Sequence, residues 1–261
     1  MLLAVDVGNT QTHIGVFKQA ELIHEWRAST NPLSTADELA LMFRDFLSLA
    51  DLSFSRQISG VAICSVVPRS TQELRAMTLD HFGYPALIVE AGVKTGIAVV
   101  TDNPKEVGAD RIANAVAAHA IFEGQAVVVV DFGTAITVDA VSAKGEYLGG
   151  AIAPGIDTSA TALFQATAQI RRVELVPPPA AIGRSTVTSV QSGIIYGTAA
   201  LVDGLVERVS KELGGDARVV ATGGLATIVA DHCHRIERVE PTLTLTGLRL
   251  IFERNPGGEL S

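Results

Sequence analysis

Two acidic turns follow apolar strands in this sequence, and both offer the chemistry of phosphate binding. Leu2–Val5 leads into Asp6-Val7-Gly8-Asn9-Thr10, and Ala126–Val130 leads into Asp131-Phe132-Gly133-Thr134-Ala135. A turn of this kind presents backbone N–H groups, and its glycine lets the backbone approach a phosphate oxygen closely. In an ordinary hairpin, the acid would instead cap its own backbone. As a matched pair, the turns predict a phosphate that is held from both sides.

The carboxylates of these turns are also suited to a divalent cation. Magnesium prefers hard oxygen ligands, usually one or two carboxylates together with substrate phosphates. Asp6 is therefore placed to hold Mg²⁺ or its water shell, and the spacing offers Asp131 to the same ion.

The two turns lie at a fixed distance along the chain. Asp6 and Asp131 are 125 positions apart, and so are Gly8 and Gly133. The same separation relates Val16 to Val141 and Glu21 to Glu146. This repeat predicts that the second half of the chain copies the first.

A further acid lies between the two copies, in the segment Gly108-Ala109-Asp110-Arg111 before the apolar run Ile112–Ala120. Asp110 is expected at the N-cap of a helix, where it would satisfy free N–H groups and contribute about 1 kcal/mol. In a cleft, the same carboxylate could accept the proton of a hydroxyl group that attacks a γ-phosphate. The local sequence leaves both roles open.

Two weaker signals complete the set of candidate residues. Gly223 and Gly224 follow the apolar strand Arg218–Ala221, so a base or ribose could lie against bare backbone there, although Gly-Gly is also an ordinary strand-to-helix turn. His13 follows the first turn and is either a phosphate contact or only a strand residue.

Composition excludes several classes of protein. The chain has 261 residues, of which 48% are hydrophobic and 18% charged, and this is a globular composition. The net charge of −8 argues against a protein that binds nucleic acid by neutralising phosphates. No charge-free apolar run reaches the roughly 18 residues that a membrane span requires. The N-terminus lacks a secretory signal, so we expect a cytoplasmic location.

Several common motifs are missing from the sequence. Neither a P-loop nor a dinucleotide-binding glycine fingerprint occurs. Cys64 and Cys233 are expected to be reduced thiols and not a disulfide framework. His232-Cys233-His234 lacks the separation that metal ligands need.

The pattern of apolar residues predicts an α/β fold in two halves. Strands are expected at 2–7, 11–18, 21–28, 58–66 and 86–89, with helices at about 35–52, 71–81 and 112–120. In the second half, strands are expected at 126–132, 135–142, 145–153, 219–222 and 236–239, with helices at 156–168, 187–213, after Gly224 and at 244–254. We expect two similar domains, 1–115 and 116–254, that face a central cleft, and a frayed tail at 255–261.

Taken together, the motifs Asp-x-Gly-Asn-Thr, Gly-Ala-Asp-Arg, Asp-x-Gly-Thr-Ala and Ala-Thr-Gly-Gly resemble the acetate and sugar kinase/Hsp70/actin superfamily. Within it, the chain is similar to the type III pantothenate kinases, and supporting segments span nearly its whole length. They include Cys64–Pro68, Thr95–Ile97, Gly149–Gly155, Gly183–Thr186, Gln191–Gly193 and Leu243–Leu248. The resemblance implies two actin-like, ribonuclease H-like domains.

The resemblance also implies a reaction, the ATP-dependent phosphorylation of pantothenate in coenzyme A synthesis. Asp110 would be the general base. Residues Asp6, Gly8, Asn9, Thr10 and His13 would line the ATP phosphates together with Thr134. Gly108, Ala109, Asp110, Arg111 and Thr186 would contact pantothenate. Asp131 would hold the monovalent cation, potassium or ammonium, that the family requires, whereas spacing alone offers it to magnesium.

The family works as a homodimer, and the long helix at 187–213 would suit a dimer contact. One departure concerns Thr101, because relatives often carry a tyrosine at this place. Two rival functions stay open: a sugar or acetate kinase of the same superfamily, and a non-catalytic regulatory protein.

Overall fold

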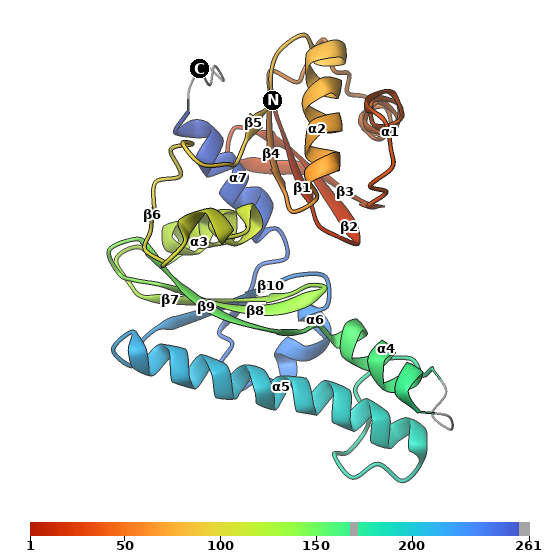
Figure 1. Ribbon diagram of the computed structural model, residues 1–261, viewed down its shortest axis with the longest axis vertical. Coiled ribbons are helices and arrows are strands. Elements are labelled where there is room, and N and C mark those ends of the chain that lie inside the picture. The colour runs from red at the N-terminus through yellow and green to blue at the C-terminus, as the bar shows by residue number, and fades with distance from the viewer. Residues whose placement is uncertain (168–171, 256–261) are drawn as a thin grey trace. The chain divides into compact units, whose positions relative to one another are not determined.

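The computed structural model describes residues 1–167 and 172–255 (Figure 1). The part of the predicted tail after Asn255 lies outside these ranges. The described residues form an α/β protein with two mixed β-sheets, which confirms the predicted fold class. Within the described residues, no helix is both long enough and apolar enough to cross a membrane.

The chain divides into two compact units. The first consists of Met1–Ile97, Asn103–Ala117 and the segment that begins at Leu243, and the second consists of Ala98–Asp102 and Ala118–Thr242. The chain therefore returns to the first unit near its end. The domain bounds expected from the sequence, 1–115 and 116–254, place this last segment with the second domain.

The first unit contains a sheet with the strand order β3-β2-β1-β4-β5. Its strands are β1 (Leu2–Val7), β2 (Gln11–Lys18), β3 (Glu21–Ser29), β4 (Gly60–Ser65) and β5 (Leu87–Ile88). Its helices are α1 (Ala36–Ser48), α2 (Pro68–Met77), the π-helical turn η1 (Thr78–Phe82), the 3₁₀ turn η2 (Pro104–Glu106), most of α3 (Ala109–Ile121), and α7 (Leu243–Glu253). The order β-β-β-α-β-α-β predicted for the first half is confirmed.

Helices cover both faces of the first sheet (Figure 1). Phe43 and Leu47 of α1 pack with Leu74 and Met77 of α2 against one face. Apolar residues of α3 and α7, including Leu245 and Leu248, pack against the other face. Because successive strand residues point to opposite faces, the apolar residues of β1 and β4 supply both cores.

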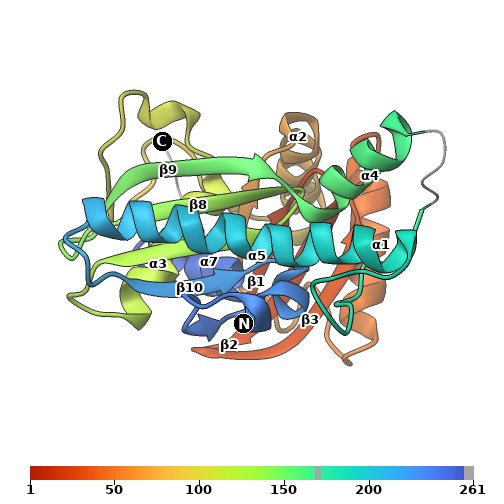
Figure 2. The same cartoon turned by 90° about the horizontal axis from the view of Figure 1, so that it is seen from below.

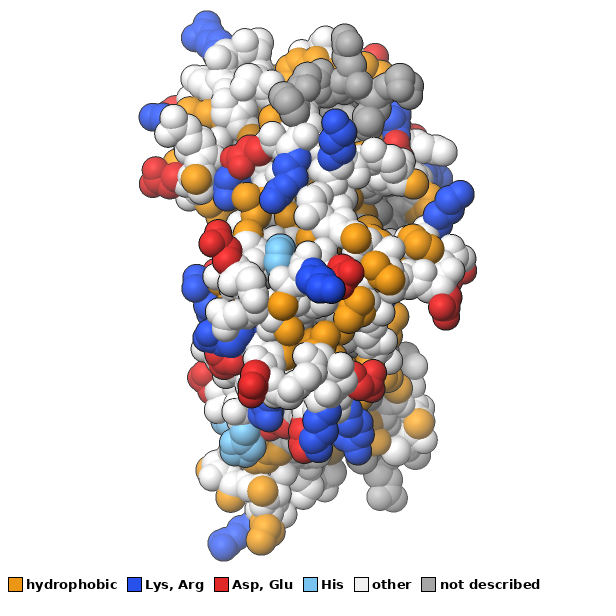
Figure 3. Space-filling view, turned by 90° about the vertical axis from the view of Figure 1, so that its left-hand side faces the viewer, with side chains coloured by type: hydrophobic (Ala, Val, Ile, Leu, Met, Phe, Trp, Pro, Cys, Tyr) orange, Lys and Arg blue, Asp and Glu red, His pale blue; other side chains and the backbone are white. Residues whose placement is uncertain are grey.

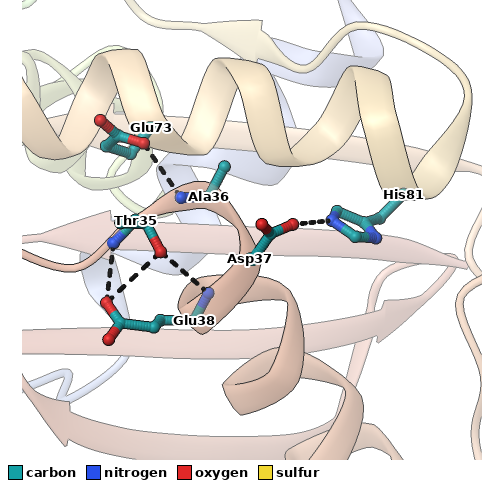
Figure 4. A network of polar contacts seen from close by, with 6 residues as sticks. All are labelled: Thr35, Ala36, Asp37, Glu38, Glu73 and His81. Atoms are coloured by element: carbon teal, nitrogen blue, oxygen red, sulfur yellow. Dashed lines mark hydrogen bonds and ion pairs between the residues drawn. The ribbon is translucent and has the colours of Figure 1, made fainter.

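A polar network fixes the start of α1 (Figure 4). Thr35 accepts a hydrogen bond from the Glu38 N–H, and the Glu38 carboxylate accepts one from the Thr35 N–H, which is the capping box that the sequence indicates. Glu73 of α2 accepts from the Ala36 N–H at 2.9 Å, and His81 of η1 pairs with Asp37. These hydrogen bonds join the first turn of α1 to α2 and to η1.

The second unit contains a sheet with the strand order β11-β10-β7-β8-β9-β6. Its strands are β6 (Ala98–Val99), β7 (Val127–Phe132), β8 (Ala135–Val141), β9 (Glu146–Pro154), β10 (Arg218–Thr222) and β11 (Arg238–Val239). Its helices are α4 (Ile156–Ala166), α5 (Thr186–Glu212), α6 (Ala226–Val229) and the 3₁₀ turn η3 (Ala230–His232). Figures 1 and 2 show α5 running along one face of this sheet, where Ile195, Val202 and Val206 are buried.

The two sheets share a strand order, because β9-β8-β7-β10-β11 repeats β3-β2-β1-β4-β5. The two-residue edge strand β6 is the addition, and its shortness explains why the periodicity gave no sign of it. The copy predicted from the sequence is therefore present in the strand topology of each unit.

The offset of 125 does not hold in every strand of the repeat. Val5 pairs with Ile14, and its counterpart Val130 pairs with Val138, so the second strands are 124 positions apart. The reason is the turn, which has three residues between β1 and β2 but two between β7 and β8. The match of Val16 with Val141 is consequently wrong, since the counterpart of Val16 is Ala140. The turn between β8 and β9 is longer than the turn between β2 and β3, so the offset between β3 and β9 returns to 125.

Candidate active site

In the first unit, the candidate residues lie in a row across the sheet. Asp6 pairs with His13 on β2 and with Cys64 on β4, and His13 pairs with Arg27 on β3. Directly paired residues project from the same face of a sheet. The side chains of Cys64, Asp6, His13 and Arg27 therefore share one face, near the carboxyl end of β1.

The turn after β1 is closed by a backbone hydrogen bond. The Gly8 N–H donates to the Gln11 carbonyl at 3.0 Å, and a Cβ at Gly8 would lie 3.1 Å from that oxygen. Glycine is needed for this close approach. The Gly8 N–H is thus engaged within the turn, and so is the Gly133 N–H, which donates to Ala135. These two amides therefore close their turns, whereas Asn9 and Thr10 are exposed.

The imidazole of His13 is buried and held by a carboxylate. Its Nε2 lies 2.9 Å from the Glu25 Oε2, and the residue is only 6% exposed. Burial lowers the pKa of His13, and this effect outweighs the Glu25 hydrogen bond, which raises it. A neutral imidazole that is hydrogen-bonded to Glu25 attracts a phosphate less strongly than a free imidazolium does. The role of His13 as a phosphate contact therefore stays a prediction.

Asp110 is the second residue of α3, and not its N-cap as predicted. The helix begins at Ala109, and the Ile112 N–H donates to the Gly108 carbonyl. A carboxylate in the first turn is favoured by the helix dipole. Gly108 makes room for it, because a Cβ at Gly108 would overlap the Asp110 Oδ1, which accepts a bond from the Arg111 N–H at 2.8 Å.

Cys64 contacts Asp6, one of the two candidate acids of the first unit. Its thiol donates to the Asp6 Oδ1 at 3.2 Å. Burial raises the pKa of Cys64 well above its ordinary range, and the charges of Asp6 and Asp110 raise it further. Both carboxylates therefore lie within electrostatic reach of one thiol. We call Cys64, Asp6 and Asp110 the Cys64 cluster.

Inspection of the sequence did not identify Cys64 as a site residue, since it lies in an apolar strand. The signal that could have found it is the pairing of strands. Once β4 is aligned in parallel with β1, Cys64 falls beside Asp6.

In the second unit, the turn after β7 meets the loop after β10. Gly223 has a φ of +96°, and a Cβ there would lie 2.5 Å from the Asp131 Oδ1 and 2.6 Å from the Phe132 backbone. The Leu225 N–H also faces the Phe132 carbonyl. The structure thus brings Asp131 and the Gly223-Gly224 loop together, and glycine is required at Gly223 by both its backbone angle and this contact.

Thr134 anchors the start of α4. Its carbonyl accepts from the Gly155 N–H at 3.1 Å and from the Thr158 Oγ1 at 2.8 Å. Gly155 is the N-cap of α4, and a side chain at Gly155 would overlap the carbonyl of Thr134. Thr158 was not predicted to join this turn, because a single hydroxyl group at the start of a helix is common.

Thr186 is the first residue of α5 and lies elsewhere in the second unit. It borders a hollow of about 540 Å³ lined also by Leu163, Ser189, Val190, Gly193 and Ile194. Ser185 caps the helix beside it through a hydrogen bond with the Thr188 N–H. Thr186 is exposed and lies among residues of α4 and α5.

The donor set of the Cys64 cluster fits a magnesium ion that is shared with a ligand. Among the described residues, no group of three or more His, Cys, Asp and Glu side chains could hold a metal by itself. Magnesium commonly takes one or two carboxylates and completes its shell with phosphates and water. Asp6 supplies such an oxygen, and the protonated Cys64 thiol does not compete for the ion, because only a thiolate is a good ligand.

On the face drawn in Figure 3, basic and acidic side chains of the described residues are interspersed and do not gather into a basic stripe. The net charge of −8 also differs from the basic balance that is typical of nucleic-acid-binding domains.

Solved structures share the fold over nearly the whole chain. A protein of Campylobacter jejuni that is named as a candidate Baf family transcriptional activator is 20% identical, with a TM-score of 0.62 over 97% of this chain and 98% of its own. A ROK hexokinase from Thermus thermophilus is 15% identical, with a TM-score of 0.52 over 98% and 99%. At these identities, the likeness shows that the fold is shared.

Sequence comparison gives the family. The family model for type III pantothenate kinase matches residues 2–208. A type III pantothenate kinase of Frankia alni is 52% identical over 98% of this chain and 100% of its own length. Those of Streptomyces avermitilis and Moorella thermoacetica are 51% and 49% identical, over 98% of this chain and 98% and 100% of theirs. The chain therefore belongs to the type III pantothenate kinase family.

Proposed function

We propose that this protein transfers the γ-phosphoryl group of ATP to pantothenate and forms 4′-phosphopantothenate, the first step of coenzyme A synthesis. The observation that carries the proposal is the Cys64 cluster, in which the turn acid Asp6 and the acid Asp110 act on one buried thiol. The proposed phosphate site lies at the carboxyl end of β1, and the proposed proton acceptor lies in the first turn of α3. Membership of the family supports pantothenate as the acceptor.

Asp110 is the proposed general base. Phosphoryl transfer depends mainly on alignment and on neutralisation of charge, so the base needs a fixed position more than a strongly shifted pKa. The first turn of α3 and the room left by Gly108 give Asp110 that position. There it would orient the primary hydroxyl of pantothenate and take up its proton.

Kinases of this family use ATP and a divalent metal, and Asp6 is the proposed magnesium ligand. A magnesium ion bound there would offset negative charge on the β- and γ-phosphates. We assign Asn9, Thr10 and Thr134 to the ATP phosphates, together with Gly8 and His13, and Gly223 and Gly224 to the nucleoside. Asp131, which lies against Gly223, is the proposed ligand of a potassium or ammonium ion.

The proposed pantothenate contacts are Gly108, Ala109, Asp110, Arg111 and Thr186. The first four form the start of α3 in the first unit, whereas Thr186 opens α5 in the second. The central cleft, the homodimer with α5 at its contact, and the cytoplasmic location remain predictions.

The test is an assay of ADP release with the purified protein, first in sodium and then in potassium salts. Pantothenate-dependent ADP release that rises in potassium is expected. A sugar or acetate kinase would release ADP only with those acceptors, and a non-catalytic regulatory protein would release none. Absence of pantothenate-dependent release in potassium would refute the proposal.

A further inference from the structure

The thiol of Cys64 occupies a place that the proposed reaction does not use directly. Cys64 lies on β4, its residue is fully buried, and its Sγ is 3.2 Å from the Asp6 Oδ1. Asp6 itself is only partly buried, at the end of β1. One oxygen of the proposed magnesium ligand is therefore held from the interior of the sheet.

The Cys64 thiol is the donor of this pair, because its Sγ lies at hydrogen-bond distance from a carboxylate oxygen, which accepts. It then contributes an S–H group and no negative charge beside Asp6. A thiolate would repel both carboxylates and bind the metal itself.

The surroundings restrict where this hydrogen bond can form. Cys64 belongs to the apolar core that contains Ala4, Ala62 and residues of α7. Register fixes Cys64 beside Asp6, since β1 and β4 pair in parallel over six residues. The donor is thus as rigid as the sheet, whereas a surface side chain or a water molecule would not be.

We infer that Cys64 is a positioning residue, whose S–H group orients the Asp6 carboxylate toward the magnesium of the bound nucleotide. The inference rests on the proposed function through the assignment of magnesium to Asp6. Groups that hold metal-ligating carboxylates or imidazoles in this way typically change metal affinity or activity by about 10–100-fold when they are removed. Because a thiol is a weak donor, an effect near the lower end is expected.

The competing explanation is that Cys64 is only a small apolar residue of the core. Three variants separate the two explanations. Cys64→Ser keeps a donor, Cys64→Ala removes it, and Val61→Ala removes apolar volume from the same strand without touching Asp6. Val61 is buried in the core on the opposite face of the sheet, so it serves as the control for lost packing.

The measurement is the dissociation constant for ATP, by calorimetry, with magnesium and with EDTA, alongside urea unfolding of each variant. In Cys64→Ala, the gain in ATP affinity that magnesium provides should fall about 10-fold, while affinity in EDTA stays within about twofold. Cys64→Ser should retain most of the gain in ATP affinity that magnesium provides. Val61→Ala should have a lower free energy of unfolding in urea but keep the full gain in ATP affinity.

Three results would overturn the inference. They are a full magnesium gain in Cys64→Ala, an equal loss in Val61→Ala, and an unmodified protein whose ATP affinity does not depend on magnesium. If Cys64→Ala does not fold, Cys64→Val is compared with Cys64→Ser instead. Because the measurement contains no pantothenate, its failure is distinct from failure of the proposed reaction, which is tested by turnover of the unmodified protein.

Discussion

Asp110 gains its proposed role from its place in the first turn of α3. Its Oδ1 bonds the Arg111 N–H, and Gly108 leaves the space that the carboxylate fills. Asp6 lies at the end of a strand, where Cys64 holds one of its oxygens. The position of Asp110 thus depends on the absence of a side chain at Gly108. The position of Asp6 depends on a hydrogen-bond donor at Cys64.

Replacement of Asp110 by asparagine tests the base directly. Asp110→Asn keeps the size of the side chain but cannot accept the proton, so kcat should fall by about 10²–10⁴-fold. The dissociation constant for magnesium ATP should stay within a few-fold of the unmodified value. Near-normal turnover in this variant would remove Asp110 from the mechanism.

Gly108→Ala tests the space beside the base. The new Cβ would overlap the Asp110 Oδ1, so the carboxylate must move, and kcat should fall about 10-fold or more while the fold persists. Gly197→Ala is the matched control, because Gly197 lies within α5 with nothing near its added Cβ. That control should raise the free energy of unfolding by about 0.5–1 kcal/mol without slowing turnover. Equal turnover in both variants would contradict the geometry.

The residues predicted from the sequence and those revealed by the structure differ for physical reasons. Asp6, Asp110 and Asp131 were identified from their types and their turns, which are local features. The N-cap assignment of Asp110 was wrong because the helix begins at Ala109, two residues earlier than an N-cap at Asp110 would require. Cys64 could not be found, since its neighbour Asp6 is 58 positions away and only strand pairing joins them.

At the scale of the elements, the strand order of the first sheet recurs in the second sheet, and the sequence pattern recurs with it. The offset of 125 locates the first strand of each copy, but a turn shortened by one residue shifts the second strands to 124. Hydrophobic alternation therefore predicted the strands well and their exact register poorly, because register depends on turn length. In the second turn, Asp131 lies against the loop after β10.

Gly223→Ala tests that contact. The residue has a φ of +96° and its Cβ would press on Asp131 and Phe132, so both stability and ATP affinity should fall. Gly215→Ala is the control, since Gly215 has a φ of +104° with open space around it. It should lose about 1 kcal/mol in urea unfolding from backbone strain alone. If calorimetry shows the same ATP affinity in both variants, the Gly223 loop does not shape the nucleotide site.

At the scale of the whole molecule, the last helix of the chain, α7, belongs to the first unit. Leu243, Leu245, Leu248 and Ile251 of α7 are buried in the first unit. Gly247 lets α7 approach the Ala113 backbone of α3, where a side chain would overlap the carbonyl. The sequence-based bounds assumed that each domain is one continuous stretch, and nothing in local periodicity marks a segment that returns to an earlier domain.

Truncation of the chain before α7 tests how much this helix contributes to the stability of the first unit. Each buried apolar side chain contributes about 1.5–3 kcal/mol, so the loss of α7 should cost an amount comparable with the whole stability of a domain. A chain that ends at Thr242 should lose the cooperative urea transition of the first unit and bind no ATP. A chain that ends at Asn255 should behave as the full protein. Cooperative unfolding of the Thr242 truncation would show that α7 is dispensable.

The most direct test of the whole account is identification of the product. The purified protein, with ATP, magnesium and potassium, is given pantothenate, and the reaction is followed by ³¹P NMR and mass spectrometry. The account predicts a phosphomonoester on the primary hydroxyl of pantothenate, formed in equal amount with ADP and lost in Asp110→Asn. ATP that stays intact, or ADP formed with no phosphorylated pantothenate, would contradict it.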